Sequence, residues 1–158
     1  GNTNIVCYED HSVFEHKESI GWDILIRMEL LTDLQNYIRK IEHASTFPMV
    51  LQKFIDQKGF KKHKDIYNKI SMKQDTFSSI LRGKYTVVKK ENVLRLCVGL
   101  NLSIDEAAEL MESAGYLFSK GLMTDVVVKA HLINQCYDPY VIDMELCENN
   151  VPALFATA

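Results

Sequence analysis

Apolar residues recur at helical spacing in two short runs between residues 64 and 85, with an interruption at Ser71. The first run comprises Ile66, Tyr67 and Ile70, and the second comprises Met72, Phe77, Ile80 and Leu81. Steps of three and four residues are typical of amphipathic helices. Arg82-Gly83 follows, and glycine is favoured just after a helix because it tolerates the left-handed conformation. The pattern predicts a helix, a tight turn and a second helix, which together form a helix-turn-helix unit.

The second of these helices has a polar face beside its apolar stripe. This face comprises Lys73, Gln74, Asp75, Ser78, Ser79 and Arg82. Short or hydrogen-bonding side chains on a helix can enter the major groove and reach the edges of the bases. The solvated face of an ordinary amphipathic helix has a similar composition, so both interpretations are open at this point.

A longer amphipathic helix is predicted from Ile20 to Ile41. Its apolar residues recur at steps of four, three, three, four and three: Ile24, Met28, Leu31, Leu34, Ile38 and Ile41. This spacing is close to the heptad repeat of helices that associate. The helix could pack on its own domain or form a dimer, and both interpretations stay open. Trp22, the only tryptophan of the chain, can anchor either interface.

Capping residues and the stop signals Gly59, Asn101 and Gly115 delimit the remaining helices. They are expected at residues 47–58, 91–100, 103–115, 124–136 and 139–147, followed by an apolar tail at 151–155 that docks on the core. Ser103 and Glu106 have the spacing of a capping box, Thr124-Asp125 can cap the next helix, and Asp138-Pro139 is a start signal. The apolar residues of the last helix are Val141, Ile142 and Met144.

Several short motifs in residues 47–116 follow the pattern of a known family. They are Tyr67, Ile70-Ser71-Met72, Phe77-Ser78-Ser79-Ile80, Arg82-Gly83-Lys84, Leu94, Val98 and Leu100-Asn101-Leu102-Ser103. Through them the region resembles the phage-repressor-type helix-turn-helix domains, the Cro-like and XRE-like family of bacterial and phage regulators. Tyr67 stands where that family usually has alanine, and Ser71 where it usually has glycine. The resemblance implies a five-helix core and DNA binding.

We therefore expect an all-α fold, with a five-helix repressor-type helix-turn-helix core, an N-terminal long helix and two extra C-terminal helices. A poorly patterned segment at residues 1–19 and the long helix at 20–44 would precede the helix-turn-helix domain at 45–118. A C-terminal helical extension at 119–158 would pack on that core. The chain begins with glycine rather than methionine, which we interpret as a tag remnant or a fragment of a longer protein.

The net charge of the chain is only −3, but the charges are segregated along it. Residues 52–95 hold twelve basic and four acidic residues, a net charge of +8. The rest of the chain holds six basic and seventeen acidic residues, a net charge of −11. Because the basic segment coincides with the predicted helix-turn-helix, it is suited to attract phosphate groups.

Other function classes lack their signatures in this sequence. The chain has no glycine-rich phosphate loop and no G-x-S-x-G motif, so we expect neither an enzyme nor a bound cofactor. Four cysteines form no C-x-x-C pair, and His131 with Cys136 lacks a second ligand pair for zinc, so reduced thiols and no metal site are expected. No apolar run approaches the roughly 20 residues of a membrane helix and no signal peptide is evident, which predicts a cytoplasmic protein.

The leading interpretation is a transcription regulator that reads double-stranded DNA through a recognition helix near residues 73–82. Base contacts are expected from Gln74, Asp75 and Ser78, since glutamine suits adenine, aspartate suits the cytosine amino group and serine suits either. Phosphate contacts are expected from His63, Lys73, Ser79, Arg82, Lys84, Lys89 and Lys90.

Two expectations concern partners. Regulators of this class usually bind DNA as two-fold dimers, so a homodimer is expected, with the stripe from Ile24 to Ile41 favoured over the last two helices as its interface. The alternative function is a non-catalytic protein-interaction module, a helix-turn-helix-like tail of a larger multidomain protein. Its partner could bind through the C-terminal helices.

Overall fold

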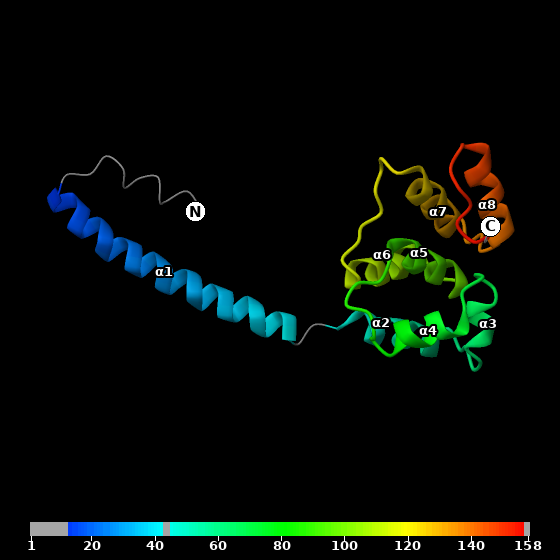
Figure 1. Ribbon diagram of the computed structural model, residues 1–158, viewed down its shortest axis with the longest axis horizontal. Coiled ribbons are helices and arrows are strands. Elements are labelled where there is room, and N and C mark those ends of the chain that lie inside the picture. The colour runs from blue at the N-terminus through cyan, green and yellow to red at the C-terminus, as the bar shows by residue number, and fades with distance from the viewer. Residues whose placement is uncertain (1–12, 43–44, 157–158) are drawn as a thin grey trace. The chain divides into compact units, whose positions relative to one another are not determined.

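The computed structural model describes residues 13–42 and 45–156, apart from the side chains of residues 13–20 and 42 (Figure 1). Within these residues the protein is all-helical, with eight helices and no strand. The all-α prediction is confirmed. The chain divides after Ala44 into two compact units, Gly1–Ala44 and Ser45–Ala158, and each is described by itself.

The N-terminal unit consists of one long helix, α1 (Val13–Glu42). It covers the helix predicted at residues 20–41 and begins seven residues earlier. Residues 13–19 of the poorly patterned segment thus belong to α1, while residues 1–12 lie outside the described part. Periodicity had not revealed these first turns, but no proline interrupts them and their Glu and Lys residues favour helix.

The C-terminal unit contains the other seven helices (Figure 1). They are α2 (Phe47–Gln57), α3 (Lys64–Tyr67), α4 (Gln74–Leu81), α5 (Lys90–Gly99), α6 (Ile104–Ser113), α7 (Met123–Ile133) and α8 (Pro139–Glu148). Helix α4 packs against α2 and α3, α5 packs against α3 and α6, and α7 joins α6 to α8. One continuous apolar core extends from Phe47 in α2 to Phe155 in the tail.

Every helix of the C-terminal unit ends in the same way. A residue with positive φ follows the last turn, and the N–H of the next residue donates to a carbonyl five positions back. The left-handed residues are Gly59, Ser71, Gly83, Asn101, Gly115, Gln135 and Asn150. The arrangement is the Schellman motif, which satisfies carbonyls that the helix leaves unpaired and turns the chain back. Glycine predicted three of these ends correctly, and Asn101 was predicted as a fourth.

The apolar tail docks on the core, as predicted, with Leu154 and Phe155 buried. The Asp143 carboxylate holds it by accepting hydrogen bonds from three successive backbone N–H groups, those of Leu154 (2.8 Å), Phe155 (3.0 Å) and Ala156 (2.8 Å). On the other side the Leu154 carbonyl accepts from the Arg95 guanidinium at 2.7 Å. An acid of α8 and a cation of α5 thus fix the end of the described chain.

The last two helices differ from expectation in detail. Helix α7 begins at Met123, so Asp125 lies inside its first turn and is buried rather than acting as the cap. Asp138 does cap α8, accepting from the Tyr140 N–H at 3.0 Å. Val141 and Met144 are exposed, at 44% and 46%, because α8 turns a narrow face to the core and buries only Ile142 and Leu146.

Phe77 is the side chain on which the position of α4 depends. It is fully buried, and its ring lies 5.7 Å from the Tyr67 ring and 5.3 Å from the His63 ring, measured between centroids. We predict that Phe77→Ala lowers the free energy of unfolding by about 3–5 kcal/mol, the usual result of truncating a buried aromatic residue. Urea denaturation tests this, and a loss below about 1 kcal/mol would contradict the packing described.

Glu106 of α6 forms an ion pair with Lys58 at the end of α2, and this contact should make the stability of the fold depend on pH. Burial opposes its ionisation, but hydrogen bonds from Lys58 (2.8 Å) and from the Ser103 N–H (2.8 Å) outweigh burial and lower the pKa of this carboxyl. The ionised form therefore stabilises the fold above the ordinary glutamate pKa, and this contribution is lost as the pH falls through the lowered value.

We predict that Glu106→Gln lowers the free energy of unfolding by about 1 kcal/mol at neutral pH. The difference from the parent should shrink as the pH falls below the ordinary glutamate pKa and through the lowered value of Glu106, because the parent carboxyl then becomes protonated as well. Glu112→Gln, a change on the same helix at an exposed residue, is the control and should show neither effect. A pH-independent difference for Glu106→Gln would exclude the ionic contribution.

Candidate nucleic-acid interface

Helices α3 and α4 are joined by a turn that sets their relative position. Hydrogen bonds from Asn68 to the Lys64 carbonyl (3.1 Å) and from Ser71 to the Asn68 carbonyl (3.3 Å) extend the path of α3 beyond Tyr67. Ser71 has φ 56°, which is the conformation for which glycine is favoured at this turn. Met72 then donates to the Tyr67 carbonyl at 2.9 Å and buries its side chain. The serine at the turn thus adopts a left-handed backbone conformation that glycine adopts most readily.

Helix α4 presents a polar face to solvent. Lys73, Gln74, Asp75 and Arg82 are exposed and Ser78 is partly exposed. Gln74, Ser78 and Arg82 are spaced by four residues, so they lie along one line of the helix, with Asp75 beside Gln74. Lys73 precedes the helix in an extended conformation and makes no side-chain cap, so the N–H groups of the first turn are not capped by it. This face combines hydrogen-bonding side chains with a helix N-terminus, an arrangement able to bind anions.

The basic segment carries less free charge than its composition indicates. Lys58 pairs with Glu106, Lys53 with Glu109, and Lys90 with Asp125. All three acids come from helices outside residues 52–95, so these pairs reduce the net charge of +8 to +5. Lys69 and Arg95 are also engaged, since Lys69 donates to the Asn101 side chain at 2.8 Å and Arg95 holds the tail.

Seven cations of the segment remain exposed, and none forms an ion pair with another described residue. They are Lys61, Lys62, Lys64, Lys73, Arg82, Lys84 and Lys89. Lys61, Lys62 and Lys64 flank His63, whose ring lies against Phe77 of α4, so this segment contacts α4. These three lysines were not among the predicted contacts, although the basic run in the sequence was a signal for them. We call the seven cations and the polar face of α4 the basic surface.

Two predicted phosphate contacts do not lie on this surface. Ser79 is buried at 6% exposure, because α4 packs against both α2 and α3 and its inner face is wider than the apolar stripe. Lys90 donates to the Asp125 carboxylate at 2.5 Å and is only partly exposed. Its acid lies 35 residues away on α7, a contact that no local pattern could predict. His63, Lys73, Arg82, Lys84 and Lys89 are all exposed.

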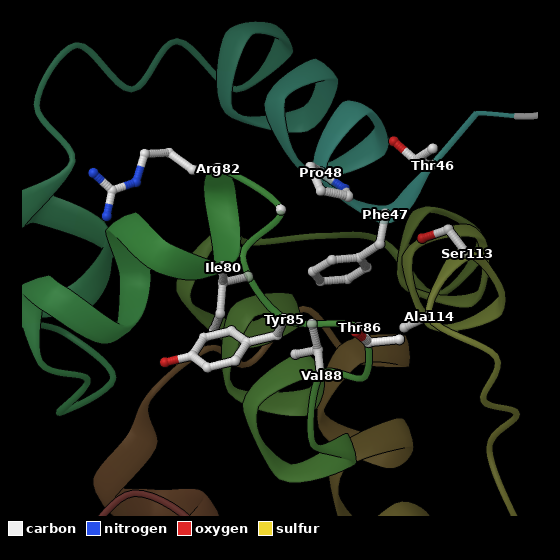
Figure 2. A pocket seen from close by; sticks show the side chains of 11 residues that line it. Thr46, Phe47, Pro48, Ile80, Arg82, Tyr85, Thr86, Val88, Ser113 and Ala114 are labelled. Atoms are coloured by element: carbon white, nitrogen blue, oxygen red, sulfur yellow. The ribbon is translucent and has the colours of Figure 1, made fainter.

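A pocket of about 580 Å³ lies behind the C-terminal end of α4 (Figure 2). Its wall combines apolar side chains of Phe47, Ile80 and Val88 with hydroxyl groups of Thr46, Thr86 and Ser113. Arg82 is its only charged lining residue, and Figure 2 shows the guanidinium pointing away from the pocket. The lining residues therefore provide no acid, base and nucleophile arrangement of the kind that catalysis requires.

No three His, Cys, Asp or Glu side chains described here are grouped so that they could hold a metal ion. Cys97 is buried, and burial raises the pKa of its thiol well above the usual range. None of the described helices has the length and hydropathy needed to cross a bilayer.

Comparisons with protein-family models, with curated proteins and with solved structures find no match to this chain. The properties of the basic surface therefore have to be argued from its own residues.

The contribution of the ion pair between Lys90 and the buried Asp125 to stability can be tested, with the neighbouring Lys89 as a control. Asp125 is 2% exposed and also accepts from the Ser119 N–H at 2.7 Å. We predict that Lys90→Met lowers the free energy of unfolding by about 3 kcal/mol, because it leaves a buried carboxylate without its cation. Lys89→Met, one residue earlier on the exposed side, should change it by less than about 0.5 kcal/mol. Chemical denaturation measures both, and equal effects would contradict the assigned roles.

Proposed function

We propose that residues 45–156 form the DNA-binding part of a transcription regulator, with α4 as the helix that enters the major groove. The basic surface carries the proposal, because its seven cations lie on α4 and on the segments just before and after it, are all exposed, and lack ion-pair partners among the described residues. Such cations attract the phosphate backbone through release of counterions. Polar side chains between them can then reach the bases.

Individual roles follow from side-chain chemistry. Gln74 suits adenine, the Asp75 carboxylate can accept from the cytosine amino group, and Ser78 can donate or accept. Phosphate contacts are assigned to Lys73, Arg82, Lys84, Lys89 and His63, with the three lysines around His63 added to the predicted set. Asp75 repels phosphate, so on this proposal its contribution is to base selection rather than to affinity.

A second candidate is a non-catalytic protein-interaction module, the tail of a larger protein. Exposed apolar residues on α7 support this candidate. Met123, Val126 and Ile133 leave 42%, 42% and 55% of their surfaces exposed on the outer side of the helix. A shallow pocket of about 260 Å³ lies beside them, next to Phe118. Exposed apolar residues gathered in this way are typical of protein interfaces.

The response of binding to salt tests the DNA proposal. We predict that affinity for duplex DNA falls with a log–log slope of about −6 against salt concentration, since each phosphate contact contributes about −0.9 and seven cations are assigned to phosphates. Replacing Lys84 and Lys89 by alanine should make that slope shallower by about 1.8. Replacing Lys120 and Lys129 removes the same charge outside the basic segment and should leave the slope unchanged.

Fluorescence anisotropy with labelled duplexes measures these slopes. Equal behaviour of the two double variants would exclude the basic surface as the binding site. Absence of binding even at low salt would favour the protein-interaction module instead. If a preferred sequence emerges by selection from random duplexes, Gln74→Ala should relax preference at one base pair by about 1–3 kcal/mol.

A further inference from the structure

The pocket behind the C-terminal end of α4 has the size of a small-molecule site. Its volume of about 580 Å³ lies within the range of ligand pockets, which is about 300–1,000 Å³. It is formed where the start of α2, the end of α4, the loop between Lys84 and Lys89, and the end of α6 meet (Figure 2). The end of α4 lies close to α2, since a Cβ added at Gly83 would be 3.3 Å from the Pro48 side chain. All of these segments belong to the C-terminal unit.

The lining of the pocket combines apolar surface with hydroxyl groups. Phe47 and Tyr85 contribute aromatic rings, and Thr46, Thr86 and Ser113 contribute hydroxyls. Thr46 occupies the capping position of α2, but its side chain forms no capping hydrogen bond. The Ser113 hydroxyl donates to the Leu110 carbonyl at 2.7 Å, which leaves its oxygen able to accept. The hydroxyls can therefore bind the polar groups of a ligand whose body lies against the rings.

The charge of the lining limits the kind of ligand. Arg82 is the only charged lining residue, and its guanidinium points away from the pocket (Figure 2). An ionised group placed in the pocket would lose part of its hydration without gaining an opposite charge there. The lining therefore favours an uncharged compound.

We propose that this pocket binds a small uncharged aromatic compound with amide or hydroxyl substituents, and that the bound compound acts as an effector of the basic surface. An aromatic body can pack against the rings of Phe47 and Tyr85. Its substituents can exchange hydrogen bonds with the hydroxyls of Thr46 and Thr86. The effector role rests on the proposed DNA binding, whereas the ligand site does not.

The loop between Lys84 and Lys89 connects the pocket with the basic surface. The backbone N–H groups of residues 85–88 form no hydrogen bond with a backbone carbonyl of the described residues. The Val88 carbonyl accepts from the Tyr116 hydroxyl at 2.7 Å. A ligand between this loop and α2 would add contacts that hold the loop. Lys84 and Lys89 would then lose less conformational freedom on binding phosphates, so the ligand should raise the affinity for DNA.

Nuclear magnetic resonance of the isotope-labelled full chain tests the site. N-acetyltryptophanamide, an uncharged aromatic amide, should at millimolar concentration shift the amide signals of Ile80, Gly83, Thr86 and Ala114 in a saturable way. N-acetyltryptophan carries a carboxylate in place of the terminal amide and should bind at least tenfold more weakly. No shift of these signals with the amide overturns the ligand site. Equal or tighter binding of the acid overturns the uncharged class.

Two matched pairs of variants locate the probe. Ala114→Leu fills the pocket and should abolish saturable binding, whereas Glu112→Leu adds the same side chain at an exposed residue of the same helix and should not. Thr86→Val keeps the shape of an exposed side chain but removes its hydroxyl, and should weaken binding about two- to tenfold. Thr124→Val, on α7, should leave binding unchanged. Circular dichroism confirms folding, and equal effects within either pair contradict the pocket.

Fluorescence anisotropy with labelled duplex DNA tests the effector role. Saturating N-acetyltryptophanamide should raise the affinity of the parent chain about fivefold, the low end of the usual coupling between two sites. The affinity of Ala114→Leu should not respond to the probe. Unchanged or lower affinity of the parent overturns the effector role. If no duplex binds even at low salt, the effector role fails together with the proposed function, while the shifts of the pocket signals still decide the ligand site.

Discussion

The left-handed residue after each helix is the constraint on which the C-terminal unit depends. It allows the next N–H to reach a carbonyl five residues back, and it reverses the chain so that the following segment returns to the core. In five of the seven cases the donating residue is apolar and lies in or against the core: Phe60, Met72, Leu102, Tyr116 and Val151. Helix ends and core packing are therefore one structural feature. The left-handed conformation has a cost at Ser71, because it destabilises a non-glycine residue by roughly 1–2 kcal/mol. The burial of the neighbouring Met72 side chain helps to offset this cost.

A second feature follows from the way acids and bases are separated along the chain. The acidic helix α6 contributes Glu106 and Glu109, and α7 contributes Asp125, as ion-pair partners for lysines of the basic segment. Charges that are separated along the sequence are thus paired across helices in the fold. Asp125 is the most buried of the three, and it also fixes the approach to α7 through the Ser119 N–H. Of the nine cations that these helices do not pair, Lys69 and Arg95 make other hydrogen bonds and the remaining seven belong to the basic surface.

The sequence predicted the helices well because periodicity and caps are local. Gly59, Gly83 and Gly115 ended three helices as expected, and the capping box of Ser103 and Glu106 formed in full. The local sequence pattern could not reveal that Ser71 and Gln135 also adopt the left-handed conformation, since serine and glutamine do not favour it. It also placed Ser79 and Lys90 on the candidate surface, because the burial of one and the ion pair of the other arise from helices far away in sequence. The lysines at 61, 62 and 64 were visible as a charge run, but only the contact of His63 with Phe77 brings that loop beside α4.

The size of the basic surface bears on how the proposed DNA binding would depend on the homodimer that the sequence predicts through the stripe of α1. Helix α4 has eight residues, so it reaches few base pairs, and Asp75 reduces its attraction for the backbone. Binding by one copy would then be weak and strongly dependent on salt. Two copies held together by α1 would present two such surfaces, and the second contact would form at a high effective concentration without any new side chain. On this view the apolar stripe of α1 contributes to affinity for DNA although none of its residues contacts a base or a phosphate.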